Sequence, residues 1–165
     1  MSDDRPAMVV IRVASPADAE AILALQKLAY QSEAKLYSDW TLAPLTQSID
    51  SLLRDFTDSV VLKANSGDRI VGSVRARLDG DTCAIARLFV HPELQRQGIG
   101  SELLRSIEAR FKDAARCELF TGSRSEGNIR LYQRHGYAIA RTQTVSPTLS
   151  LVVLEKRVLH GTAEE

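Results

Sequence analysis

The chain has 165 residues, of which 44% are hydrophobic and 25% are charged. This length favours one domain with a core of its own, and the composition is that of an ordinary globular protein. The 21 lysines and arginines balance the 21 acidic residues, so the net charge gives no support for nucleic acid or a membrane surface as the main partner. No apolar run reaches the roughly 20 residues of a membrane span, and the polar start MSDDRPAM lacks the features of a secretory signal. We therefore expect a cytoplasmic protein.

The two cysteines, Cys83 and Cys117, lie far apart and within apolar stretches. This placement favours buried, reduced thiols over a disulfide framework. The cysteines and the three histidines do not supply an obvious ligand set for zinc. We expect no metal site.

The first part of the chain alternates one strand with helical patterns. The β-branched run 8–14 predicts a strand. Ser15 and Pro16 are typical of a helix start, and the apolar spacing after them predicts an amphipathic helix over 16–31. The segment 31–44 mixes aromatic and charged residues without a clean period, as expected for a helix end followed by a loop. A shorter helix is predicted over 46–56.

The middle of the chain predicts an antiparallel meander. Strands are expected at 59–64, 69–79 and 82–91, because short turn sequences with Gly67 and Gly80 separate three runs rich in apolar residues. The apolar spacing of the next segment predicts a helix over 98–112.

The last part predicts a strand at 115–122, a helix at 126–136 and two closing strands at 137–145 and 149–158. This mixed order indicates an α/β (α+β) fold in one domain, 1–165, around one mostly antiparallel sheet of about seven strands with about four helices. Residues 1–7 and 160–165 are expected to be frayed tails.

The segment HPELQRQGIG, between a strand and a helix, is the most informative stretch. The free amides of a helix start and its positive dipole end suit a phosphate or pyrophosphate, and Gly98 and Gly100 would let the backbone approach it. The spacing fits neither the Rossmann fingerprint nor the P-loop, which argues against a nucleotide-binding module. The glycines alone are equally consistent with a turn that merely enters a closely packed helix.

Two motifs together point to a family. The stretch Gln95–Gly100 resembles the coenzyme-A-binding motif (Q/R-x-x-G-x-G/A) of the GNAT N-acetyltransferase superfamily. Downstream, Asn128, Tyr132 and Gly136-Tyr137 are similar to the family's N-x-x-x-Y-x-x-x-G-[FY] segment. The expected order of strands and helices is also that of the family. The resemblance implies central strands that splay apart, and acetyl-CoA as the co-substrate.

The resemblance also implies site residues. Tyr132 would be the general acid for the coenzyme A sulfur, because a phenol with a pKa of about 10 is protonated at neutral pH. Asn128, on the same helix face, would bond the pantetheine arm or a water. The alternative explanation for Tyr132 is that its ring simply packs in the core. The backbone of the strand before the turn would pair with pantetheine, and the Val90 amide would polarise the thioester carbonyl. The implied cofactor-binding residues are Leu88, Phe89, Val90, Gln95, Arg96, Gln97, Gly98, Ile99, Gly100, Ser101, Asn128 and Tyr132.

The general base is open. Some relatives carry a glutamate on the strand before the turn, but here that strand reads Ala84-Ile85-Ala86-Arg87 and has no carboxylate. The remaining candidates are Glu118, Glu126, Glu33, His91 and a water chain. His91 precedes Pro92 in a turn, where a solvated histidine is the common explanation.

The acceptor site is equally open. Glu33 and Tyr37, with Asp39 and Trp40, suit a cationic amine or else belong to a helix with solvated charges. Glu118 is a further acceptor-binding candidate. We expect an acetyl-CoA-dependent N-acetyltransferase acting on a primary amine of a small molecule or peptide. The alternative is a non-catalytic acyl-CoA-binding sensor on the same fold. The closing strands could support a homodimer or form internal core.

Overall fold

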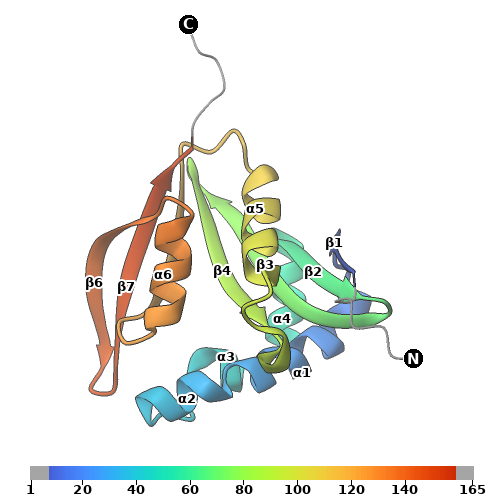
Figure 1. Ribbon diagram of the computed structural model, residues 1–165, viewed down its shortest axis with the longest axis horizontal. Coiled ribbons are helices and arrows are strands. Elements are labelled where there is room, and N and C mark those ends of the chain that lie inside the picture. Colours follow the sequence, from blue (N-terminus) through green and yellow to red (C-terminus); the bar gives the residue numbers. More distant parts are fainter. Residues whose placement is uncertain (1–7, 159–165) are drawn as a thin grey trace, which may run out of the picture.

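A computed structural model describes residues 8–158 of the chain. The tails expected at 1–7 and 160–165 lie outside the described residues. The elements form one seven-stranded sheet with helices on both faces (Figure 1). The predicted α/β fold around one mostly antiparallel sheet is confirmed.

The sheet has the strand order β1-β2-β3-β4-β5-β7-β6. Neighbouring strands are antiparallel except for β4 and β5, which are parallel. The strands are β1 (Val9–Val13), β2 (Val60–Ser66), β3 (Arg69–Asp79), β4 (Thr82–Val90), β5 (Arg116–Gly122), β6 (Ala138–Ser146) and β7 (Leu149–Arg157). All seven agree with the predicted strands to within two residues at either end.

The helices are more numerous than the sequence pattern predicted. They are α1 (Ala19–Ala29), α2 (Gln31–Tyr37), α3 (Ala43–Thr46), α4 (Ile49–Asp58), α5 (Ile99–Ala109) and α6 (Glu126–Arg134), with short 3-10 turns at Pro16–Asp18 and Pro92–Leu94. The segment 31–44 is where the prediction was wrong, since it contains α2 and the start of α3. Ala34 and Tyr37 of α2 are buried, and Tyr37 lies against Gly122 and Ser125, far along the chain. Periodicity within a short segment does not reveal such contacts.

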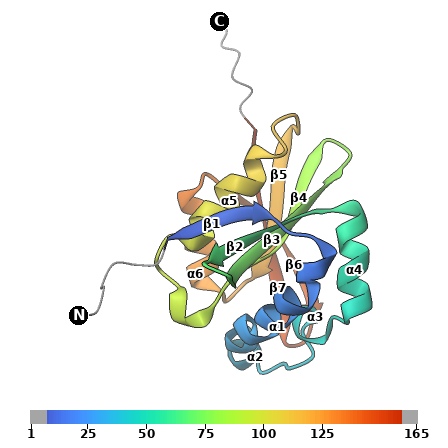
Figure 2. The ribbon, with the colours of Figure 1, turned by 90° about the vertical axis from the view of Figure 1, so that its right-hand side faces the viewer.

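Two hydrophobic clusters hold the helices to the sheet. One cluster packs α5 and α6 against β2, β3, β4 and β5, with Leu103, Leu104 and Ile107 fully buried. The other packs α1 and α4 against the opposite face, where Ile22 and Leu52 are fully buried. Figure 2 shows α5 on one side of the β1–β4 half and α1 with α4 on the other.

Several expectations about chemistry can be compared with this fold. Cys83 and Cys117 are free and buried, as predicted, and they face each other as register partners on β4 and β5. Among residues 8–158, no three His, Cys, Asp or Glu side chains gather in a way that could hold a metal ion. Within the same range, no helix combines the length and apolarity needed to cross a bilayer.

Candidate active site

The two central strands separate near the middle of the sheet. Strands β4 and β5 are paired only from Thr82 to Ala84 on β4, opposite Arg116 to Glu118 on β5. Beyond Ala84, β4 stays paired with β3 as far as Val90, and β5 stays paired with β7 as far as Gly122. Each strand therefore has one free edge, and the two halves of the sheet diverge as a V (Figure 1). The free edges expose backbone groups to which an extended molecule can pair.

The glycine turn lies at the end of the free edge of β4. Gln95, Arg96, Gln97 and Gly98 are exposed, and two of them have left-handed backbones, with φ of 64° at Arg96 and 85° at Gly98. Gly98 is the N-cap of α5 and provides no side chain to cap the first-turn amides. A helix start with free amides and alternating backbone handedness is a site for anions.

Position 100 is where the turn, β4 and α6 meet. A methyl group at Gly100 would lie 3.5 Å from Leu131 of α6 and 3.9 Å from Val90 of β4. Ile99 is buried beneath the turn, and Ser101 bonds His135 at the end of α6 at 2.9 Å. The start of α5 is thus joined to both walls of the V.

Tyr132 is the buried acid candidate on α6. Its side chain is 5% exposed and belongs to the larger hydrophobic cluster, with its ring centroid 6.2 Å from that of Tyr137. Burial raises the pKa of the Tyr132 phenol well above its ordinary value, and the nearby Tyr30 and Glu33 raise it further. Tyr132 therefore keeps its proton at neutral pH and can donate it.

Helix α2 supplies a carboxylate to the same region. Glu33 accepts hydrogen bonds from the Ser125 hydroxyl at 2.8 Å and from the Asn128 amide at 3.2 Å. Asn128 also donates to the Thr121 hydroxyl at 3.2 Å. The structure therefore brings Glu33 and Asn128 together at the start of α6. Asn128 uses its amide protons within the protein.

Tyr37 fastens α2 to the end of β5. Its hydroxyl lies 2.8 Å from the Ser125 hydroxyl and accepts a bond of 2.9 Å from the Arg124 amide. The ring is 4% exposed and occupies the space over Gly122, where any Cβ would overlap it. Trp40, by contrast, is exposed.

Comparison with known proteins identifies the family. The family model described as "Acetyltransferase (GNAT) family" matches residues 20–137, most of the chain. The chain belongs to the GNAT acetyltransferase family. The resemblance drawn from the two motifs is confirmed.

Solved structures show that this GNAT chain has the family's fold. The PaiA N-acetyltransferase from Thermoplasma acidophilum, solved in complex with coenzyme A, is 17% identical with a TM-score of 0.75, over 91% of this chain and 99% of that one. The ribosomal-protein-S18-alanine N-acetyltransferase from Escherichia coli is 16% identical with a TM-score of 0.77, over 96% and 97% of the two chains. At these identities the likeness concerns the fold.

A curated relative is similar in sequence. The UPF0157 protein YqkA of Bacillus subtilis is 26% identical over 135 residues. The match covers 82% of this GNAT chain and 39% of YqkA, so the chain spans well under half of that relative's length.

The base candidates of this GNAT chain differ in their surroundings. Glu118 lies 3.7 Å from Arg141, and Glu126 is exposed and lies 3.7 Å from Arg130. His91 is buried, which corrects the expectation of a solvated histidine, and its Nδ1 accepts a bond from the Glu93 amide at 3.1 Å.

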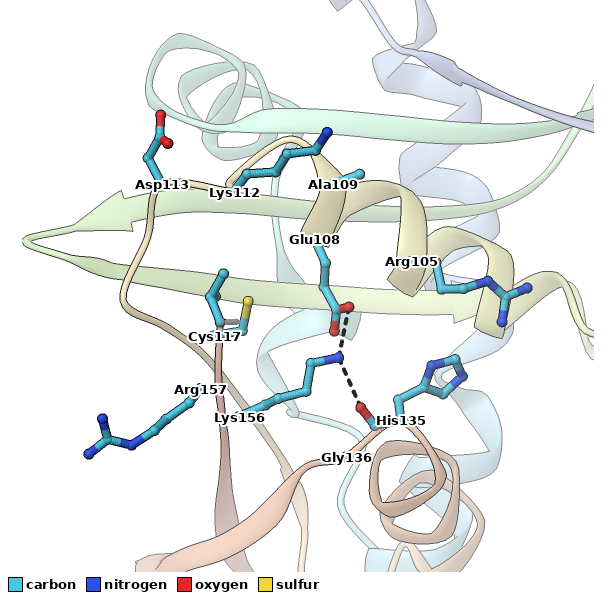
Figure 3. Close-up of a pocket in the computed structure, with 11 residues that line it drawn as sticks. Arg105, Glu108, Ala109, Lys112, Asp113, Cys117, His135, Gly136, Lys156 and Arg157 are labelled. Atoms are coloured by element: carbon cyan, nitrogen blue, oxygen red, sulfur yellow. Dashed lines mark hydrogen bonds and ion pairs between the residues drawn. The ribbon is translucent and has the colours of Figure 1, made fainter. Parts of the chain in front are cut away.

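A cavity of about 890 Å³ opens elsewhere, between the end of α5 and the end of α6 (Figure 3). None of the predicted site residues lines it. Its central groups are paired with each other, since Lys156 bonds Glu108 and the His135 carbonyl at 2.9 Å each. Glu108 also accepts a bond from Tyr137. We therefore place the candidate active site at the V of the sheet, where the free strand edges and Tyr132 lie, rather than in this cavity.

Sequence reasoning missed several residues of this region. Ser125, Thr121 and Tyr30 were not singled out, although Ser125 directly precedes a predicted helix, a position that favours serine. No local pattern could have joined Glu33 to Asn128, because the two are 95 positions apart.

Proposed function

We propose that the chain is an acetyl-CoA-dependent N-acetyltransferase that acts as one domain on a primary amine. The observation that carries the proposal is the meeting of three features at Gly100: the uncapped start of α5, the free edge of β4 and the helix that carries Tyr132. The first suits a pyrophosphate, the second an extended pantetheine arm, and the third a proton for the leaving sulfur.

The residues of the turn fit the diphosphate of coenzyme A. The left-handed backbone at Gly98 explains the glycine there, and a Cβ would meet nothing within 4 Å, so the space above the turn is open. Gly100 is helical and has ordinary room for a methyl group. Since glycine costs roughly 1 kcal/mol in a helix relative to alanine, neither packing nor backbone angle accounts for Gly100, whereas a ligand lying against the backbone does.

The chemistry assigned to the chain's own groups is direct acyl transfer. The neutral amine of the acceptor forms a bond to the thioester carbonyl carbon, while the free edge of β4, with the Val90 amide, holds and polarises the carbonyl. As the carbon–sulfur bond breaks, the electron pair leaves with sulfur, and Tyr132 gives its proton to that sulfur. The attacking nitrogen loses one proton to water, and Tyr132 regains one from solvent. The products are the acetamide and the free thiol.

The proposed roles of the remaining residues follow from their contacts. Leu88, Phe89 and Val90 would present backbone groups to the cofactor, and Gln95 to Ser101 would surround its diphosphate. Asn128 would act as a positioning residue, because it ties Glu33 to the start of α6. Glu33, 2.8 Å from Ser125, would present a negative charge to the incoming amine.

The test is an amine panel with acetyl-CoA. Free thiol release and acetylation of the amine, detected by mass, are followed for polyamines, aminoglycosides, amino acids and peptides with free N-termini. Acetylation of at least one class supports the proposal. Tight acetyl-CoA binding with no turnover on any amine would instead indicate the acyl-CoA-binding sensor.

A further inference from the structure

Strand β4 has a bulge at the point where it leaves β5. Its register with β3 shifts so that Arg87 and Leu88 stand opposite Val74 alone, and Arg87 has a left-handed φ of 53°. Ile85 packs on the α5 side and Phe89 on the α1 side, although residues four apart on a regular strand share a face. The bulge therefore turns the chain and re-aims the Arg87 side chain, as bulges beside active sites do.

Arg75 of β3 lies under α1 and α4 and is only 4% exposed. Its Nη2 donates to Gln26 at 3.2 Å and to Gln47 at 2.9 Å, and its Nε lies 3.4 Å from the Asp55 carboxylate. Its Nη1 is buried and has no hydrogen-bond partner among the described residues. One face of this guanidinium is thus held firmly while another donor is unused.

Arg87 has the same deficiency. Its Nε is buried without a partner in the part of the chain that the structure describes. Burial and the charge of Arg87 together lower the pKa of Arg75 to about 10, although Asp55 acts in the opposite direction. The two arginines, here called the arginine pair, lie on neighbouring strands, because Arg75 pairs with Ala86, the residue before Arg87. Together they carry two positive charges, and Asp55 is the carboxylate that contacts Arg75. Buried charged donors normally have partners, so this excess needs an explanation.

The arginine pair lies beside the proposed reaction centre. Tyr30, at the end of α1, packs its ring edge against Phe89 of β4 at 6.0 Å between centroids. Burial raises the pKa of Tyr30, the charges of the arginine pair lower it, and Glu33 raises it. Tyr30 and Glu33 act in turn on Tyr132. The positive charges of the arginine pair and the negative charge of Glu33 therefore both act on Tyr30.

We propose that the arginine pair binds a carboxylate of the acceptor, so that the enzyme acetylates small amines that carry a carboxylate, such as amino acids. This inference rests on the proposed function. Guanidinium groups match the two oxygens of a carboxylate, and each arginine of the pair has one buried donor without a partner among the described residues. A single carboxylate neutralises the one positive charge that Asp55 leaves, whereas a phosphate dianion would exceed it. Glu33 suits the amine end of the same molecule.

The experiment compares amino acids with their carboxamides, which keep the amine and the side chain but lack the carboxylate charge. With acetyl-CoA saturating, kcat/KM is measured for each pair. We expect the acids to exceed the amides by roughly 10- to 100-fold, the usual range for a charge-assisted hydrogen bond.

Arg87→Gln tests the assignment, because Arg87 has a free Nε and its loss does not release the contacts that hold Arg75. In Arg87→Gln, the ratio of kcat/KM for acid over amide should fall at least several-fold toward one, because the charge of Arg87 is lost while Arg75 remains. Arg77→Gln is the matched control, since it removes the same charge from an exposed position two residues beyond Arg75 on β3. It should keep the ratio of the unmodified protein. The preferred amino acid, added with coenzyme A, should raise the Tm of the unmodified protein and of Arg77→Gln, and should not raise the Tm of Arg87→Gln.

The outcomes separate the two proposals. Acetylation of amines without a carboxylate, combined with amide and acid rates that are equal in the unmodified protein, overturns the carboxylate site and leaves the N-acetyltransferase intact. A ratio that survives in Arg87→Gln also overturns it. Absence of thiol release with every amine contradicts the proposed function itself.

Discussion

The replacement Tyr132→Phe removes one oxygen from the proposed acid and little else. The ring is 5% exposed and packs in the larger hydrophobic cluster, so phenylalanine should fill the same space and the variant should fold. Loss of a general acid usually lowers the rate by about 100- to 10,000-fold. At 1.36 kcal/mol per tenfold change, this corresponds to roughly 2.7–5.4 kcal/mol of barrier height. Acetyl-CoA binding should change little, since the hydroxyl is needed only when the sulfur leaves.

The assay is steady-state thiol release from pH 6 to pH 10, with acetyl-CoA affinity measured separately. Because the pKa of Tyr132 is raised, the unmodified enzyme should show no loss of kcat from Tyr132 ionisation across this range. Tyr137→Phe is the matched control: Tyr137 is also buried and adjacent, but it donates its hydroxyl to Glu108. Equal kcat values for Tyr132→Phe and the unmodified enzyme would refute the acid role. A loss of kcat in Tyr137→Phe as large as in Tyr132→Phe would show that the effect is not specific to the Tyr132 hydroxyl, and would also refute the acid role.

Three further predictions concern stability. Tyr137→Phe removes a hydrogen bond to a carboxylate on α5, so the free energy of unfolding should fall by about 2 kcal/mol and Tm by roughly 4–8 °C in a thermal melt; an unchanged Tm would mean the bond is not formed in solution. Gly122→Ala places a methyl group where the Tyr37 ring lies, whereas a methyl at Gly127 meets nothing within 4 Å, so only the first variant should lose Tm. Burial lowers the pKa of His135, so the unfolded chain binds a proton more readily and stability should fall as the pH drops below about 6.5. His135→Gln should therefore lose less Tm than the unmodified protein between pH 7 and pH 5, and parallel curves would contradict this.

Much of the fold could be predicted from local patterns. The strands were found because their apolar runs end at glycine turns, and the helix after Gly98 was found because Leu103, Leu104 and Ile107 recur at helical spacing. The helix α2 was missed since Tyr37 is buried against the end of β5 and the residues before α6, far along the chain. Short helices that depend on distant contacts leave little periodic signal.

The site was predictable only in part. The motif residues Gly98 and Tyr132 could be named because each sits in a recognisable spacing. The bulge that aims Arg87, and the burial of Arg75 beneath α1, arise from pairing between strands and from packing. A sequence shows an arginine at such a position but not the unused donors that make it informative.

Acetyl-CoA binding by Gly98→Glu, measured by titration calorimetry beside Gly67→Glu, tests the central claim most directly. Both glycines have left-handed backbones, with φ of 85° and 63°, and a Cβ at either meets nothing within 4 Å. The two variants therefore impose the same backbone strain and the same added charge, but only one places that charge over the start of α5. Like-charge contact costs several kcal/mol, so Gly98→Glu should weaken acetyl-CoA binding by at least about 100-fold, while Gly67→Glu should bind as the unmodified protein does. Equal affinities for acetyl-CoA in the two variants would contradict the claim that the glycine turn holds the cofactor.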